Sequence, residues 1–148
     1  MTVKILNEKP PEWIMQGCMN AFRIDIDSTF WTYGDTIYNP GGRVLPDHII
    51  AHEKTHMRQQ ETCEGGKDAW WKEYLANPRF RLEQEAEAYA AQYRFFCEQV
   101  RDRNARALIL DRICTSFSGP LYQLALTKQQ AKAMILVLSG QKQLSDIT

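Results

Sequence analysis

The sequence lacks several features that would each define a class of protein. It has no apolar run near the roughly 18 residues of a membrane span, and residues 1–10 (MTVKILNEKP) lack the apolar centre of a signal peptide. Basic and acidic residues number 18 each, so the formal net charge is zero. Without a basic excess, neither a nucleic acid nor a membrane surface is expected as a partner. The sequence therefore predicts a soluble, cytoplasmic protein.

Cysteine and glycine are also sparse, and neither forms a recognisable binding motif. The four cysteines, Cys18, Cys63, Cys97 and Cys114, include no C-x-x-C pair. Because the chain shows no secretory leader, we expect free thiols rather than disulfides. The segment GGK at residues 65–67 lacks the upstream glycine and the following serine or threonine of a P-loop, so it is expected to be a turn.

The composition fits one globular domain that spans residues 1–148. With 148 residues and 44% hydrophobic content, the chain is long enough to bury a core, and it shows no internal repeat or linker. Alternating apolar residues over 23–38, with a turn at Gly34–Asp35, predict a hairpin or small sheet. Asp47 is expected to cap the next helix. The predicted helices cover about 12–19, 48–64, 68–75, 78–104, 105–117 and 127–138. The predicted class is therefore α+β, mainly helical, with a small N-terminal sheet before the helix that begins at His48.

All three histidines of the chain lie in that helix, at four-residue intervals. Residues 52–56 read HEKTH, which is an H-E-x-x-H motif. On a helix, positions i and i+4 share one face and are about 6 Å apart in rise, so both imidazoles can bind one metal ion. Glu53, rotated by about 100°, lies beside the metal and can accept a proton from a bound water. The plainer alternative is a solvated helix face with two exposed histidines.

A catalytic zinc usually takes three protein ligands, so the sequence must supply one more. The metzincin extension needs a glycine at 59 and a histidine at 62, but the chain has Gln59 and Thr62. His48 lies about 12 Å from His56 along the helix, which is too far for both to share one zinc with His52. His48 is therefore expected at the protein surface, or in contact with a ligand without binding the metal.

The remaining candidates are carboxylates in the helix predicted over 78–104. Its buried face is centred on Leu82, Ala86, Tyr89, Tyr93, Phe96 and Val100. Glu85 lies about 60° from the centre of that face, whereas Glu83 lies about 100° and Glu87 about 140° away. Glu85 is therefore the best inward-pointing carboxylate. Asp68 is an alternative third ligand, although capping of the following helix is the expected role of its side chain.

Four segments together resemble a known group of enzymes. They are IIAHEKTHMRQQ at 49–60, WKEYLANPRF at 71–80, QEAEAY at 84–89 and SGPLY at 118–122. The chain resembles the zincin metallopeptidases of the gluzincin type, and within them small peptidases common in phage and prophage genomes. The resemblance implies a zincin-like minimal domain with His52, His56 and Glu85 as zinc ligands and Glu53 as general base. A second alignment, E-x-x-A-E at 83–87, is similar to membrane-associated gluzincins and would make Glu83 the ligand.

The resemblance implies a zinc metallopeptidase that hydrolyses peptide bonds with a zinc-activated water. Tyr89 and Tyr122 are candidates to stabilise the oxyanion, although a core role for each tyrosine is the simpler expectation. By resemblance, the strand at 36–38 would pair with extended substrate, and Trp31, Tyr33 and Tyr38 could line subsites. The expected partner is a protein or peptide substrate in the cytoplasm, that of a host if the gene is a phage gene. The protein itself would be a monomer or a weak homo-oligomer.

The alternative is a non-catalytic, zinc-stabilised, phage-encoded binding protein. It would use the apolar residues of 70–74 or of 134–138 to bind its partner, although both stretches suit a core or an oligomer seam equally well. Such a module needs the metal ligands but not Glu53 as a base. The presence of Glu53 in the motif therefore favours the enzyme.

Overall fold

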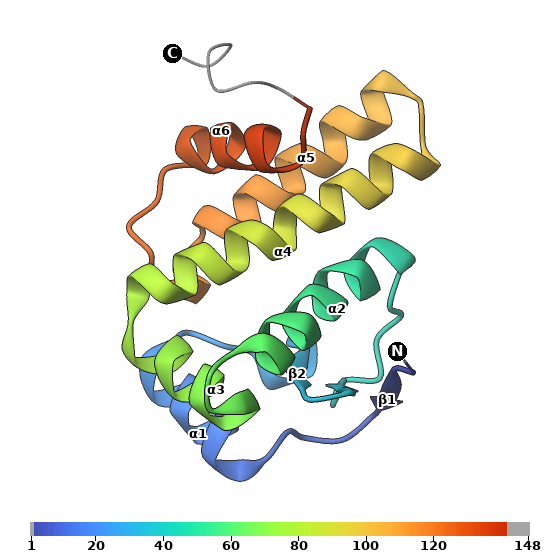
Figure 1. The fold of residues 1–148 in the computed structure, drawn as a ribbon. Helices are drawn as coiled ribbons and strands as arrows, with labels where there is room; N and C mark the ends of the chain where they lie inside the picture. The colour runs from blue at the N-terminus through green and yellow to red at the C-terminus, as the bar shows by residue number, and fades with distance from the viewer. Residues whose placement is uncertain (1, 142–148) are drawn as a thin grey trace.

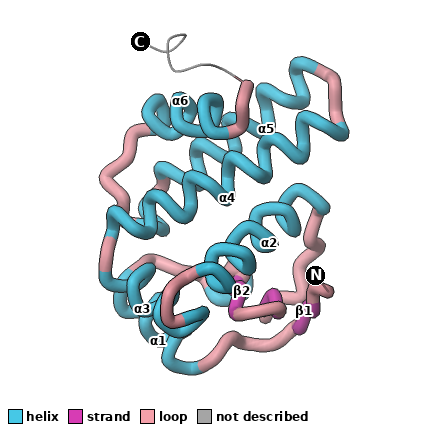
Figure 2. The backbone as a smooth tube through the Cα atoms, in the orientation of Figure 1, coloured by secondary structure: helices cyan, strands magenta, loops and turns pink. Residues whose placement is uncertain are grey.

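The computed structural model describes residues 2–141, and it is mainly helical with a small sheet near the N-terminus (Figures 1 and 2). The predicted α+β class is therefore confirmed. The described elements, with η for a 3-10 helix, are β1 (Lys4–Leu6), α1 (Glu12–Ala21), η1 (Ile26–Ser28), β2 (Trp31–Tyr33), β3 (Thr36–Tyr38), α2 (Asp47–Thr62), α3 (Gly66–Ala76), α4 (Pro78–Gln99), α5 (Arg103–Ser118), η2 (Pro120–Tyr122) and α6 (Lys128–Leu138).

The sheet has the strand order β1-β3-β2. The predicted hairpin is confirmed, because β2 pairs antiparallel with β3 across a turn in which Gly34 adopts a φ of 62°. β1 pairs parallel with the other side of β3 and was not predicted, since three exposed residues give too short a pattern. The alternation before Thr29 was misread as strand: Asp25 accepts a hydrogen bond from the backbone of Asp27 and begins η1 instead.

Helices α2 and α4 pack against each other in the middle of the structure (Figure 1). The sheet and α3 lie against α2, and α1 packs on α3. On the other side, α5 and α6 pack against α4 and against each other. The faces of α2 and α4 that carry the candidate ligand residues therefore meet inside the protein rather than at its surface.

Helix α2 begins one residue earlier than predicted. Pro46 is the capping position and no side chain caps the helix, so the expected cap by Asp47 is wrong. Asp47 is instead the first helical residue, where its negative charge meets the positive end of the helix dipole. The helix ends before Cys63, and the chain turns through Gly65 with a φ of 88°.

Helix α4 is shorter than predicted. The Asn77 side chain accepts hydrogen bonds from the backbone at the helix start, followed by Pro78 in the first turn. The helix ends at Gln99 rather than at Asn104, because Val100 is extended and Asp102 caps the start of α5. The sequence offers no glycine or proline there to signal the break. The capping box predicted at Thr127 is confirmed at the start of α6.

The buried apolar side chains form two clusters, one on each side of the α2–α4 contact. One joins α4, α5 and α6, and it includes Tyr89, Phe117 and Ile135. The other joins α1, β2 and α3 around Trp31 and Trp70. All four cysteines are free, as expected. Within residues 2–141, no helix combines the length and the apolar character that a membrane span needs.

Candidate metal centre

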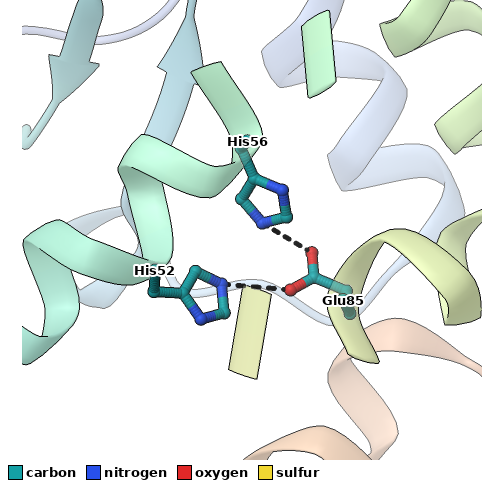
Figure 3. Close-up of side chains that lie close together, drawn as sticks. All are labelled: His52, His56 and Glu85. Carbon is teal, nitrogen blue, oxygen red and sulfur yellow. Dashed lines mark ion pairs between the residues drawn. The ribbon is translucent and has the colours of Figure 1, made fainter. Parts of the chain in front are cut away.

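The structure brings the side chains of His52, His56 and Glu85 together between α2 and α4 (Figure 3). Nε2 of His52 lies 3.1 Å from Oε1 of Glu85, and Nε2 of His56 lies 3.3 Å from Oε2. One possible ligand atom from each residue falls within 4.8 Å of the other two. All three residues are buried, with 6%, 5% and 3% of their surface exposed. This buried His-His-Glu group could hold a metal ion.

Two glutamines hold the far edges of the histidine rings. Nδ1 of His52 lies 3.0 Å from Oε1 of Gln92, and Nδ1 of His56 lies 2.8 Å from Oε1 of Gln59. An amide oxygen only accepts, so each Nδ1 carries the hydrogen and donates it. A neutral ring then has its lone pair on Nε2, facing Glu85. This is the orientation in which a histidine binds a metal through Nε2.

The carboxylate of Glu85 is satisfied on only one of its two oxygens. The hydroxyl of Tyr74 donates to Oε2 across 2.6 Å. Oε1 has no hydrogen-bond partner in the described part of the chain, even though Nε2 of His52 lies 3.1 Å away, because that approach lacks hydrogen-bond geometry. A buried, unpartnered carboxylate oxygen is costly, and a cation among the three residues would satisfy it. Two imidazoles and one carboxylate are a donor set typical of catalytic zinc.

The charges of this group perturb each other strongly. Burial alone would raise the pKa of Glu85, but the neighbouring His56 charge and the two ring contacts outweigh it and hold the pKa well below its usual range. Burial alone would lower the pKa of His56, but the Glu85 carboxylate outweighs it and raises the pKa to about 9. Without a metal, a proton on His56 therefore neutralises the buried carboxylate.

Glu53 follows His52 on α2 and points to a different partner. The hydroxyl of Thr32 in β2 donates to Oε2 of Glu53 across 2.7 Å. Thr32 is itself fixed, because its carbonyl oxygen accepts from Nε2 of Gln60 at 2.8 Å and from Nε1 of Trp71 at 2.9 Å. Glu53 is buried and is absent from the ligand group. The sheet therefore orients the carboxylate that the sequence predicts as general base.

Both predicted tyrosines lie at the site. The Tyr89 ring packs edge-on against His52 with centroids 4.4 Å apart, and its hydroxyl shares a hydrogen bond of 2.6 Å with the hydroxyl of Tyr122. Burial and the nearby Glu85 charge raise the pKa of each tyrosine above its usual range, so both stay protonated. Arg81, one turn before Glu85, donates to the carbonyl oxygens of Tyr74 and Tyr122. It thereby ties both tyrosine segments to α4.

The other sequence candidates lie elsewhere. Glu83 is exposed and pairs with Arg79, while Glu87 is exposed and pairs with Arg58. Asp68 accepts a hydrogen bond from the hydroxyl of Tyr33, and Gly65 rather than Asp68 is the capping residue of α3. The helical-phase argument therefore selected the carboxylate that the structure places beside both histidines.

His48 lies one turn before His52 and was expected only as a neighbour. It is half-buried, and its Nδ1 is 3.0 Å from Nε2 of Gln92. Burial lowers the pKa of His48, against the opposing charge of Asp47. Sequence reasoning missed Gln92, although it follows Glu85 by two helical turns and so shares its face. Gln59 could have been found in the same way, because it follows His56 by one turn and so shares its helical face.

A cavity of about 610 Å³ opens onto the metal group and Glu53. Its walls include Phe30 and Trp31 before and in β2, Val44 in the loop before α2, and Ile109 and Arg112 on α5. Of the three aromatic residues predicted to line subsites, Trp31 does so, whereas Tyr33 and Tyr38 do not. The strand at 36–38 is paired on both sides, so the expectation that it adds a substrate strand is wrong.

No family model, curated protein or solved structure matches this chain. Its function is therefore inferred from the residues of the site rather than from a relative.

Proposed function

We propose that the protein is a zinc-dependent metallopeptidase in which His52, His56 and Glu85 hold zinc and Glu53 is the general base. One observation carries the proposal: the buried Glu85 carboxylate has an oxygen, Oε1, without a hydrogen-bond partner among the described residues. Oε1 faces Nε2 of His52 and Oε2 of the same carboxylate faces Nε2 of His56, and Gln92 and Gln59 orient the two rings. Without a metal, a proton on His56 can balance the charge of the carboxylate, but Oε1 still lacks a hydrogen-bond partner among the described residues.

Three protein ligands favour a catalytic site over a structural one. Structural zinc sites are closed by four protein ligands, whereas catalytic sites keep a position for water or substrate. Within residues 2–141, the group brought together has three members, and it opens onto the cavity. This argument favours the peptidase over the zinc-stabilised binding protein that the sequence left as the alternative.

Zinc bound at this position would polarise a peptide carbonyl group and activate a water molecule. Glu53 is the residue that accepts and passes on the proton. Thr32 holds Oε2 of its carboxylate, so Oε1 can take a proton from the water and deliver it to the leaving amine. The same hydrogen bond holds the Glu53 carboxylate toward β2, away from the His52, His56 and Glu85 group.

Tyr89 and Tyr122 supply a hydrogen-bond donor to the developing oxyanion. Their two hydroxyl groups share one hydrogen bond, which uses only one of the two hydroxyl hydrogens. The second hydrogen can be donated to a substrate oxygen in the cavity, which both residues line. Because both groups stay protonated, this donor is present over the whole neutral pH range.

The deciding experiment compares wild-type protein with the Glu53→Gln variant. We expect about one zinc per chain in both proteins by mass spectrometry, because Glu53 is not a ligand. Cleavage of a peptide library should be detected for wild type and lost for Glu53→Gln, since glutamine cannot accept the proton. Exposed Glu61, also on α2, provides the matched control, and Glu61→Gln should cleave like wild type. Wild-type protein that binds zinc but cleaves no library peptide would contradict the proposal.

A further inference from the structure

Gln92 joins a metal-ligand histidine to the third histidine of α2. Its side chain is buried on α4, with Oε1 3.0 Å from Nδ1 of His52 and Nε2 3.0 Å from Nδ1 of His48. One planar amide group thus contacts two imidazoles that are one helical turn apart. The peptidase mechanism proposed above uses Gln92 only to orient the His52 ring and gives no role to His48.

The two ends of an amide are chemically different, and this gives the chain of contacts a direction. The oxygen of Gln92 only accepts a hydrogen bond and the nitrogen only donates one. In the observed orientation, Nδ1 of His52 carries a hydrogen and Nδ1 of His48 offers a lone pair. Because a neutral imidazole has one N–H, the lone pair of His52 is then on Nε2 and the hydrogen of His48 is on Nε2. A half-turn of the amide would reverse both assignments.

Only the observed orientation suits metal binding. His52 approaches Glu85 through Nε2, so a hydrogen on Nε2 would block the position that the metal needs. Metal-binding histidines usually donate their other N–H to a carboxylate, a backbone carbonyl or water. A carboxylate can accept hydrogen bonds from two rings at once, so the tautomer of one ring does not affect the tautomer of the other. A glutamine cannot accept from both rings, because the ring that donates to its oxygen leaves only the N–H donors of its nitrogen for the other ring.

We propose that Gln92 and His48 are positioning residues that hold His52 in its metal-binding tautomer, and that a metal on His52 in turn places the hydrogen of His48 on Nε2. The inference rests on the metal site of the proposed function but not on peptide hydrolysis. His48 lines the same cavity as the metal group, and its Nδ1 is occupied by Gln92. In the metal-loaded protein, His48 therefore carries its hydrogen on Nε2 rather than on Nδ1.

The first test reads the tautomers directly in the full-length, zinc-loaded protein. Long-range proton–nitrogen NMR spectra of the histidine rings should show the hydrogen of His48 on Nε2 and that of His52 on Nδ1. In the Gln92→Glu variant, the carboxylate accepts from both rings, so His52 should be unchanged while His48 gains a hydrogen on Nδ1. The proposal would be overturned if His48 had the same protonated nitrogen in both proteins.

The second test measures zinc affinity by competition with a chelator. Gln92→Leu should weaken zinc binding about 10- to 100-fold, the usual cost of losing a partner of a ligand histidine. His48→Phe should weaken it by a smaller factor, because the amide keeps its contact with His52 but loses the hydrogen-bond partner of its Nε2. Gln92→Glu should bind at least as tightly as wild type. Gln99→Leu, at an exposed glutamine of the same helix, should match wild type.

The outcomes separate this inference from the function on which it rests. Circular dichroism of each zinc-free variant checks that a change in affinity is not a loss of folding. If folded Gln92→Leu bound zinc as tightly as wild type, Gln92 would have no positioning role. If wild-type protein bound no zinc at all, the metal site itself would fail, and the inference with it.

Discussion

The hydroxyl of Tyr74 donates to Oε2 of Glu85 across 2.6 Å and leaves Oε1 of the same carboxylate without a hydrogen bond. The two oxygens therefore differ before any metal arrives. Oε2 is fixed by α3, and Oε1 is the oxygen that remains to bind a cation.

Removal of the carboxylate should abolish metal binding. Glu85→Gln replaces Oε1 or Oε2 with a nitrogen that carries hydrogens and cannot bind a cation. We expect zinc per chain to fall from about one to near zero in mass spectrometry of the untagged protein. Glu83→Gln, two residues away and exposed, is the control and should keep its zinc. Loss of zinc in Glu83→Gln alone would instead favour the second alignment of the motif.

The hydrogen bond from Thr32 to Glu53 should be needed for turnover but not for metal binding. Thr32→Val keeps the shape of the side chain and removes its hydroxyl. We expect kcat to fall roughly tenfold, which corresponds to about 1.4 kcal/mol and is typical of a lost hydrogen bond to a charged group. Thr32→Ser should restore most of the rate. Equal loss of zinc and activity in Thr32→Val would indicate a structural role only.

Tyr122→Phe should lower kcat without changing zinc content. The substitution removes one hydroxyl of the Tyr89–Tyr122 pair, so the pair loses its shared hydrogen bond and the remaining Tyr89 hydroxyl is no longer held in place by it. We expect a decrease of about 100-fold, as for a lost oxyanion donor, with KM little changed. Tyr33→Phe, at a tyrosine outside the cavity lining, is the comparison. An unchanged kcat in Tyr122→Phe would assign the tyrosine pair to packing alone.

The metal-free protein should lose stability as the pH rises from about 6.5 to about 9. The pKa of His56 is raised from 6.5 in the unfolded chain to about 9 in the folded one, so its contribution is complete below pH 6.5 and is lost through pH 9. The depressed pKa of Glu85 adds stability above its unfolded value of 4.5, which is lost at lower pH.

Urea denaturation in the presence of a chelator would measure this dependence. The free energy of unfolding should decrease by on the order of 3 kcal/mol between pH 6.5 and pH 9. Glu85→Gln should remove most of this slope, because it removes the charge that raises the His56 pKa. A wild-type stability that increased over the same interval would contradict the assignment of the proton to His56.

Local patterns were enough to predict the positions of the helices and the His52, His56 and Glu85 group that the structure brings together. The four-residue spacing of His52 and His56 defines one helical face without reference to the rest of the chain. Glu85 could be chosen over Glu83 because the buried face of α4 is marked by its own apolar residues. The polar contacts between different elements could not be predicted in this way. The contacts of Gln92 with α2 and of Thr32 with Glu53 join residues far apart in sequence, and polar side chains give no periodic signal of their partners.

The errors in the predicted elements arise where another element decides the local structure. β1 is three residues long and depends on β3 for its existence, so its own sequence says little. The end of α4 at Gln99 comes from the competing cap at Asp102, which begins α5. In both cases a neighbouring element decides the structure, and intrinsic propensity does not.

His56 and Glu85 stand on either side of α3 in the chain, so a metal ion bound by both closes a loop that contains the whole of that helix. Closing such a loop restricts the unfolded chain, in the way that a disulfide does, and this chain has free cysteines instead. Acquisition of the ion would then also be a folding event. Chelation should expose α3 and its flanking turns to limited proteolysis before the helices packed beyond α4.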